Sequence, residues 1–313
     1  MMILLTYFRT ISLGLLIALF TLPTAANAAL ETQKVGPGIY ALVGELTQRS
    51  PENYANNSTH GIIITDDGVI VIDSGGSYLG AKQIHTAIKA LTDQPIKLVI
   101  NTGGQDHRWL GNGYFKQLGA HILSSSVTKE DQQTRVDSHL TRLQGLIGDS
   151  LKGTQAVYPD EVFETVKSLE MGGIKLELHH VGAAHTIGDS FVWLPEQKIM
   201  FTGDIVFVER ALGIGPAKNA KSWIQVFEQM ATYEPDVIVP GHGHATDLST
   251  ATKDTHSYLS FLVNKITMML DNGDDLQTAA KLDQSQFNYL AVFDEIASKN
   301  AHNLYTQLEF DSF

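Results

Sequence analysis

Histidine and aspartate stand at the ends of four apolar segments whose composition is typical of β-strands. Asp106-His107 follows the segment IKLVINT, and His185 follows the segment GIKLELHHV. Asp204 ends the segment IMFTGD, and His242 ends the segment VIVPGH. Imidazole and carboxylate donors without a thiolate suit Zn, Mn or Fe. The sequence therefore predicts a metal site that is assembled from loops far apart in the chain.

The elements that must position these loops can be predicted from hydrophobic periodicity and turn residues. Two β-branched runs around Asp66-Asp67-Gly68 predict a hairpin, because Asp-Gly between such runs is a strong hairpin signal. The apolar spacing of LGAKQIHTAIKAL predicts a helix over 79–91. The remaining pattern predicts strands at 38–46, 96–102, 120–126, 173–181, 190–204 and 236–243, and helices at 112–119, 127–150, 220–233 and from about 250 onward.

Composition and the first residues indicate where the chain works and what it does not bind. Residues 1–28 contain one cation, Arg9, then the apolar run ISLGLLIALFTL and the small-x-small sequence Ala26-Asn27-Ala28, which predicts a cleaved secretory signal. The alternative is an uncleaved membrane anchor. The chain has no cysteine and a formal net charge of -12, or -13 without Arg9. We therefore expect a periplasmic or secreted protein that binds neither nucleic acid nor anionic lipid.

Three motifs resemble the metallo-β-lactamase superfamily. They are VIDSG (71–75), HVGAAHTIGDSFVWLPEQKIMFTGDIVF (180–207) and VIVPGHG (237–243). The resemblance covers roughly residues 33–245 and is greatest to the periplasmic branch associated with sulfur oxidation and quinoprotein relay systems. It implies an α+β fold, an αββα sandwich with a mono- or dinuclear metal site at one edge of its two sheets. We expect a single domain over residues 29–313, with a C-terminal helical extension over about 250–313.

The segment NTGGQDHRWLGN (101–112) departs from the pattern of that family. The family signature is Asn-Thr-His-x-His-x-Asp-His, closing with Gly-Asn. Without gaps, its two leading histidines fall on Gly103 and Gln105; with a one-residue slip, they fall on Thr102 and Gly104. Both alignments lack the two histidines that complete the first metal site. We therefore expect one divalent metal ion, Zn with Mn or Fe as alternatives, rather than two.

The resemblance implies a ligand set for that ion. The expected ligands are His107, Asp204 and His242, with Asp106 or His185 as a fourth. Two imidazoles and a carboxylate leave open positions for water and substrate. The ion would lower the pKa of a bound water and yield a hydroxide near neutral pH. Asp106 or His185 would orient or deprotonate that water.

Other polar residues near these motifs receive supporting roles. Gln105 is expected to contact substrate or to act as a weak amide ligand, and an inward-pointing Arg108 would stabilise an oxyanion. Asp73 is expected to orient a ligand histidine from behind. Asp189 is expected to brace its own loop, and His139 receives no role.

These expectations favour a periplasmic metal-dependent hydrolase of a small ester, thioester, lactone or amide. The alternative is a non-catalytic binding protein that keeps the fold while its metal site has decayed. A mononuclear iron oxygenase of sulfur compounds is a third hypothesis, although relatives of that kind use one of the missing histidines. A small molecule is the expected partner, stable membrane insertion is not expected after signal cleavage, and the oligomeric state is left open.

Overall fold

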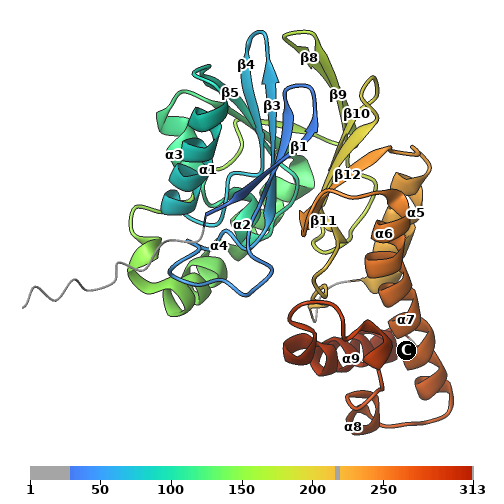
Figure 1. The fold of residues 1–313 in the computed structure, drawn as a ribbon. Helices are drawn as coiled ribbons and strands as arrows, with labels where there is room; N and C mark the ends of the chain where they lie inside the picture. Colours follow the sequence, from blue (N-terminus) through green and yellow to red (C-terminus); the bar gives the residue numbers. More distant parts are fainter. Residues whose placement is uncertain (1–28, 216–218, 312–313) are drawn as a thin grey trace, which may run out of the picture.

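Two β-sheets pack face to face in the computed structural model, which describes residues 29–215 and 219–311 (Figure 1). The expected signal segment at 1–28 lies outside the described residues. The first sheet has the strand order β1-β2-β3-β4-β5-β6-β7. Its strands are β1 (Glu31–Gly36), β2 (Ile39–Val43), β3 (Thr59–Thr65), β4 (Gly68–Ile72), β5 (Ile96–Asn101), β6 (His121–Ser125) and β7 (Glu161–Phe163).

The second sheet has the order β12-β11-β10-β9-β8 and supplies two of the loops that the sequence singled out. Strands β11 and β12 run parallel, so their carboxyl ends meet at one edge. Its strands are β8 (Val166–Met171), β9 (Ile174–His179), β10 (Phe191–Leu194), β11 (Ile199–Phe207) and β12 (Val237–His242).

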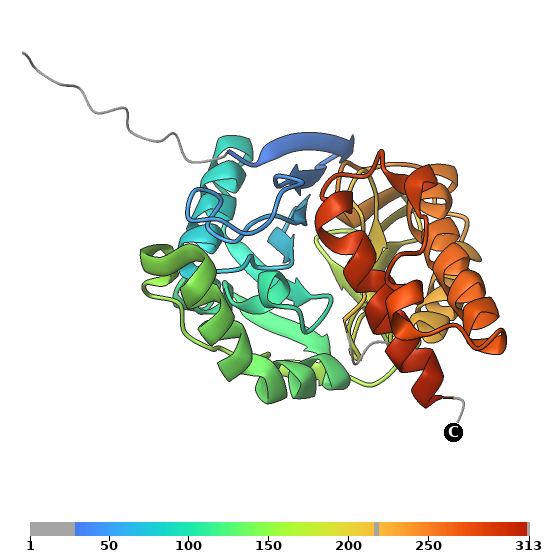
Figure 2. The ribbon, with the colours of Figure 1, turned by 90° about the horizontal axis from the view of Figure 1, so that it is seen from below.

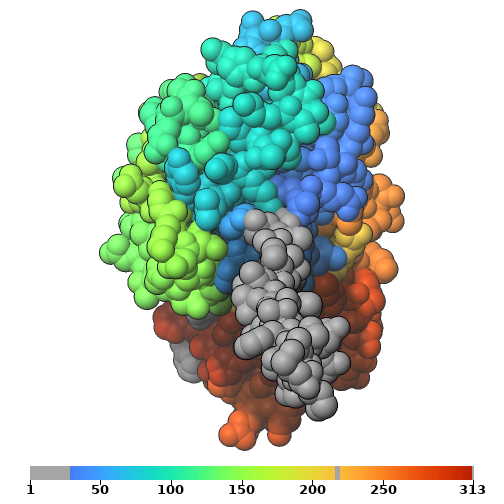
Figure 3. All heavy atoms as spheres, turned by 60° about the vertical axis from the view of Figure 1, so that its left-hand side comes forward, coloured from blue at the N-terminus to red at the C-terminus, as the bar shows by residue number. Residues whose placement is uncertain are grey.

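Three apolar layers hold the sandwich together. Ile63, Ile70, Val192 and Phe201 belong to the core between the sheets. A second core joins the first sheet to α1 (Tyr78–Leu91) and α3 (Asn112–Gln117), which lie on its outer face together with α4 (Ser126–Ile147) (Figure 3). A third core joins the second sheet to α5 (Ala220–Ala231) and to the C-terminal helices. The observed αββα arrangement confirms the expected fold class.

The C-terminal helices pack on the second sheet and extend below the sandwich (Figure 1). Seen from below, α4 and α9 lie on opposite sides of the edge where α2 follows β5 (Figure 2). None of the described helices combines the length and the apolarity that a membrane crossing needs. The helical elements not yet given are α2 (Asp106–Trp109), a 3-10 turn at Gly148–Leu151, α6 (Leu248–Ala251), a π-helical turn at Thr252–His256, α7 (Ser257–Asp271), α8 (Leu276–Ala279), a 3-10 turn at Ser285–Phe287 and α9 (Phe293–Phe310).

Most predicted elements match the structure, and the edges of the sheets do not. The Asp66-Asp67-Gly68 hairpin is confirmed, with Thr65 opposite Gly68, and the helix expected at 79–91 is α1. Strands β1, β7 and β8 were not predicted. Strand β7 has three residues, and β8 alternates between exposed and half-buried side chains, so neither carries the apolar run of a central strand.

Candidate metal centre

Two histidines and an aspartate converge where the two sheets meet. His107 lies on α2, directly after β5, whereas Asp204 lies within β11 and His242 ends β12. One donor atom from each lies within 4.8 Å of the other two, and all three residues are buried. No other such group of three occurs in the part of the chain that the structure describes. The expected ligands His107, Asp204 and His242 are therefore brought together.

The hydrogen bond of His242 leaves its second nitrogen available as a ligand. Its Nδ1 lies 2.7 Å from the carbonyl oxygen of Asn57, which can only accept, so Nδ1 carries the proton. The Nε2 lone pair then lies 3.4 Å from Asp204 Oδ1. Two electron-rich atoms that face each other in a buried place fit a cation between them. Burial lowers the pKa of His242 to about 4, so the ring is neutral at pH 7.

His107 is held differently, because an arginine contacts it. Arg49 Nη2 lies 2.6 Å from His107 Nδ1 and also pairs with the carboxylate of Asp106. Since a guanidinium only donates, Nδ1 accepts and the ring proton lies on Nε2, which donates to Asp204 Oδ2 at 3.0 Å. A metal ion at Nε2 would replace this hydrogen bond, and the proton would move to Nδ1 or leave. Arg49 would then lose its bond to His107.

Arg108 points inward, is fully buried, and supports the centre from below. Its Nη2 donates to Asp204 Oδ1 at 2.6 Å and to the Gly241 carbonyl at 2.8 Å. Its Nη1 donates to Asp73 Oδ2 at 2.9 Å and to the Thr59 carbonyl at 3.0 Å. All four terminal N–H groups are therefore occupied. The substrate-binding role predicted for Arg108 stays a prediction, and it would require one of these bonds to break.

Asp73 contacts the centre through Arg108 and a threonine. Its carboxylate accepts hydrogen bonds from Thr102 N and Thr102 Oγ1, each at 2.8 Å. Burial raises the pKa of Asp73 to about 6, although the charge of Arg108 opposes that shift. Its backbone carbonyl lies 3.2 Å from His60 Nδ1. The carboxylate of Asp73 thus braces Arg108, and the role expected of Asp73 behind a ligand histidine stays a prediction.

Asp106 is buried beside the ligand group with one oxygen unsatisfied. Burial alone would raise its pKa, but the charges of Arg49, His107 and His139 and the hydrogen bond from Arg49 together outweigh burial and hold the pKa well below its usual range. Asp106 Oδ1 accepts from Arg49 and from the backbone N–H of His107, whereas Oδ2 has no hydrogen-bond partner among the described residues. A buried carboxylate oxygen of this kind fits a site that takes a cation or an ordered water.

The place of the missing histidines is filled by other side chains. A Cβ atom at Gly103 would overlap Asp189 Oδ1, and a Cβ atom at Gly104 would overlap Asp131 Oδ2. Gln105 lies next to them and accepts from Arg135 Nη1 at 3.3 Å. The segment can approach these carboxylates so closely only because it has no side chains there.

His185 lies apart from the group of three. Its ring packs against Phe207 and Trp223, with ring centroids 5.4 and 5.3 Å away. Asp189 braces the same loop, because it accepts from both the backbone N–H and the hydroxyl of Thr186. The ligand and catalytic roles expected of His185 stay predictions.

Sequence reasoning missed two residues at the centre, Arg49 and His139. Arg49 lies in an irregular segment between β2 and β3, about which the local pattern says nothing. His139 was assigned no role, yet it is buried on α4 next to Asp106, and its Nδ1 has no hydrogen-bond partner among the described residues. Burial lowers the pKa of His139 to about 4. The one available signal was its spacing of four from Arg135 and three from Arg142 on a predicted helix.

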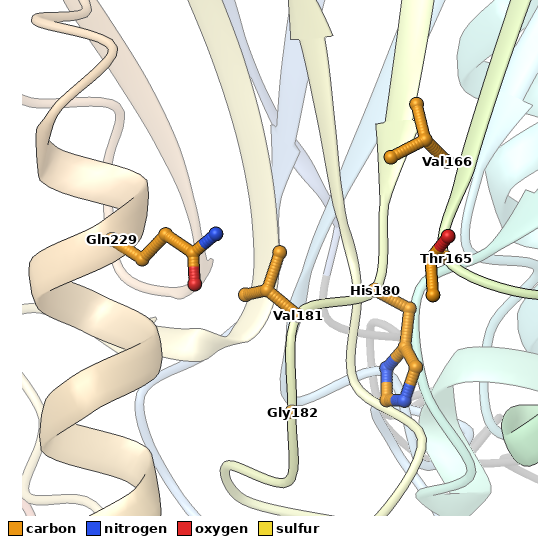
Figure 4. Close-up of a pocket in the computed structure, with 6 residues that line it drawn as sticks. All are labelled: Thr165, Val166, His180, Val181, Gly182 and Gln229. Carbon is orange, nitrogen blue, oxygen red and sulfur yellow. The ribbon is translucent and has the colours of Figure 1, made fainter.

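A surface hollow lies elsewhere, between α5 and the edge formed by β8 and β9 (Figure 4). His180 and Gln229 face it from opposite sides. It shares no residue with the ligand group. The hollow is lined by Thr165, Val166, His180, Val181, Gly182 and Gln229.

The sequence profile of the metallo-beta-lactamase superfamily matches residues 56–242, which is more than half of the chain. The chain belongs to the metallo-beta-lactamase superfamily. Members of this superfamily are mostly metal-dependent hydrolases that bind divalent ions, typically zinc. The chain is 27% identical over 211 residues to a metallo-beta-lactamase type 2 of Elizabethkingia meningoseptica, covering 66% of this chain and 76% of that protein.

Solved structures show the same fold. A metallo-beta-lactamase from Pontibacter korlensis superposes with a TM-score of 0.58 at 26% identity, covering 74% of this chain and 99% of that one. The stereoselective inverting sec-alkylsulfatase Pisa1 from Pseudomonas sp. superposes with a TM-score of 0.71 at 18% identity. That match covers 90% of this chain and 50% of the sulfatase chain.

The charges of the centre fit a divalent cation. The connected ion pairs contain three carboxylates, from Asp73, Asp106 and Asp204, and two guanidiniums, from Arg49 and Arg108. One negative charge is therefore left over in a buried place, where an uncompensated charge is costly. Together with the lone pair of His242, this excess fits a metal ion of the kind that the superfamily binds.

Proposed function

We propose that this protein is a periplasmic, mononuclear metal-dependent hydrolase that acts on a small ester, thioester, lactone or amide. The convergence of His107, Asp204 and His242 in one buried group is the observation that carries the proposal. The filled space beside Gly103 and Gly104 supports one ion rather than two. Superfamily membership supports hydrolysis as the reaction class.

The proposed mechanism assigns each polar group a separate task. His107, Asp204 and His242 would hold the ion, most simply Zn, which supplies Lewis acidity toward a water and a carbonyl group when bound. Asp106 lies next to this group, and its Oδ2 has no hydrogen-bond partner among the described residues, so it would orient the water by accepting a hydrogen bond from it. Arg108 would hold Asp204 in place. It would transfer no proton in the reaction, because its four terminal N–H groups already donate hydrogen bonds.

His185 and Gln105 keep smaller roles in this proposal. Gln105 Nε2 lies 3.3 Å from Asp106 Oδ1, so a substrate contact from Gln105 would also affect Asp106. His185, whose buried ring packs against Phe207 and Trp223, is the proposed fourth ligand.

The test measures metal content and activity together. The mature chain, its His242→Ala variant and a His302→Ala control are purified, and bound metal is counted by plasma mass spectrometry. His302 is an exposed residue of α9, so its loss removes a histidine without touching the centre. We expect about one ion per chain in the wild type and the control, and loss of that ion in His242→Ala. Hydrolysis of 4-nitrophenyl acetate should fall by at least about 100-fold with it.

Each other outcome decides against part of the proposal. Two ions per chain would show that the one-metal interpretation is wrong. Equal hydrolysis in the wild type and His242→Ala would rule out the metal mechanism. The absence of metal, even after purification in added zinc, would favour the second candidate function, a non-catalytic binding protein. The observation that favours this candidate is the contact of Arg49 with His107 Nδ1, which holds the ring in the tautomer that a metal at Nε2 must displace.

A further inference from the structure

Every arginine after residue 28 lies around the metal centre. The chain has arginine at positions 49, 108, 135, 142 and 210 in that region, whereas its lysines number many more and its net charge is -12. An acidic protein that places all five of these guanidiniums in one area has concentrated there the cation that binds planar and tetrahedral oxyanions best. This clustering of arginines indicates that they bind a ligand rather than that they keep the protein soluble.

Helix α4 turns one face toward the centre. Arg135, His139 and Arg142 are spaced by four and three residues, so their side chains lie along one side of the helix. Arg135 reaches Gln105, and the charge of Asp106 acts on both His139 and Arg142. This face therefore lies against α2, and Arg142 is its exposed, outer member.

The segment between β2 and β3 brings a third arginine, Arg49, to the centre. Arg49 lies over Asp106 and His107. Arg210 supports that segment from beneath, because its Nε donates to the Leu46 carbonyl at 2.9 Å and its Nη2 donates to Gln48 Oε1 at 3.3 Å. The nearby carboxylate of Glu295 accepts from Gln48 rather than from Arg210.

Two of these guanidiniums have no carboxylate partner. Arg142 forms no hydrogen bond or ion pair with any described residue, and Arg210 donates only to carbonyl and amide oxygens. Burial first, and then the positive charge of Arg49, lowers the pKa of Arg210, and the charge of Arg49 also acts on the exposed Arg142. The positive charge of Arg49 therefore acts on both Arg142 and Arg210, and an anion bound near them would relieve this repulsion.

Metal binding as proposed above would make an anion near these arginines more favourable. A divalent ion turns the excess negative charge of the buried ion pairs into an excess positive charge. It also removes one of the two acceptors of Arg49, because His107 Nδ1 can no longer accept a hydrogen bond once it carries the ring proton. Arg49 then keeps its pair with Asp106, while its buried Nε, which has no hydrogen-bond partner among the described residues, can donate to a ligand.

We propose that Arg49 and Arg142 bind the acidic group of an anionic substrate, a carboxylate or a sulfur oxyanion, next to the metal centre. The inference rests on the proposed function and names its substrate class: a small ester, thioester, lactone or amide that also carries an acid group. Arg210 contributes its charge and holds the segment that carries Arg49. Charge-assisted, bidentate bonds from guanidinium to oxyanion are the strong kind.

The first experiment measures binding without hydrolysis. Isothermal titration compares 4-phenylbutyrate with the neutral 4-phenylbutyramide, on the protein as purified and after removal of metal with a chelator. Because an acid can also coordinate a metal, a preference that survives metal removal belongs to the arginines. We expect the acid to bind at least about tenfold more tightly than the amide in both forms, and less tightly as sodium chloride is raised.

Variants assign the preference to Arg142. We expect Arg142→Gln to lower the ratio of acid to amide affinity by about tenfold and Arg142→Lys to restore part of it, because lysine keeps the charge without the fork. The control is Lys152→Gln, which removes the same charge from an exposed side chain beyond the end of α4. A ratio that Arg142→Gln and Lys152→Gln change equally would overturn the proposal.

The two proposals fail in different ways. Equal binding of acid and amide by a protein that binds metal and hydrolyses 4-nitrophenyl acetate overturns the anion site alone. Preference for the acid in a protein that hydrolyses nothing supports the anion site and contradicts the hydrolase. Titration of 3-phenylpropanesulfonate in parallel distinguishes the two oxyanions, since tighter binding of the sulfonate favours a tetrahedral group and tighter binding of the butyrate favours a planar one.

Discussion

Carboxylates lie on both sides of the metal centre, but they have different surroundings on each side. On the side of the second sheet, Asp204 and His242 project toward His107 and leave donor atoms facing one another. On the side of Gly103 and Gly104, carboxylates of neighbouring segments already fill the space that side chains would need. The connected ion pairs on the first side keep one excess negative charge. The second side is packed, because Asp189 and Asp131 lie against the two glycines.

The largest expected effect on the free energy of unfolding comes from removing Arg108, which holds Asp73 and Asp204 on the first side. Arg108→Met leaves Asp73 and Asp204 buried without their shared cation, and breaking a buried pair in this way costs about 3–5 kcal/mol. We expect the free energy of unfolding, measured by urea denaturation, to fall by about that amount in the metal-free protein. Lys152→Gln serves as the control and should change it by less than about 0.5 kcal/mol. Unchanged stability in Arg108→Met would mean that Arg108 does not hold this side together.

A substitution on the packed side tests the other half of the comparison. We expect Gly103→His to lower the free energy of unfolding by about 1–3 kcal/mol, because its side chain meets Asp189, and to bind no second ion. Metal content and urea denaturation are measured on the same preparation. Gly103→His with Asp189→Gly makes room and sharpens the test. A single variant that gains an ion at full stability would contradict the idea that this side is filled.

The smallest expected effect is a pH dependence of the free energy of unfolding, and it comes from His139. His139 stays neutral in the folded protein because burial lowers its pKa from 6.5 to about 4, while the unfolded chain takes up a proton below pH 6.5. The groups that face it are Asp106, Arg135, Asp131 and Arg49. Its contribution to stability is therefore present above pH 6.5 and is lost as the pH falls toward 4.

The measurement compares the free energy of unfolding at pH 7 and pH 5. At pH 5 this one histidine should account for about 2 kcal/mol of the loss. His139→Gln should therefore lose less stability than the wild type between the two pH values, and His302→Ala should lose as much as the wild type. The same loss in all three proteins would show that His139 is charged, or accessible to solvent, in the folded state.

The sequence predicts the parts of this protein that local patterns encode. The Asp66-Asp67-Gly68 hairpin, helix α1 and the strands that carry His107, Asp204 and His242 follow from turn residues and periodicity. Strands β7 and β8 are not predicted, because a short or half-exposed edge strand has no run of buried apolar residues. Arg49 escapes for another reason: its segment has no periodic pattern, and only the tertiary structure places its guanidinium over Asp106.

The glycines at 103 and 104 bear on how reversible this centre is over evolutionary time. A single mutation that returns histidine to position 103 introduces a clash before it offers a ligand, since Asp189 occupies the place of its first carbon. The return path therefore needs at least two changes, of which the first alone is harmful. The same holds at position 104, where Asp131 leaves no room for a Cβ atom, so a side chain at either glycine costs stability before it can add a ligand.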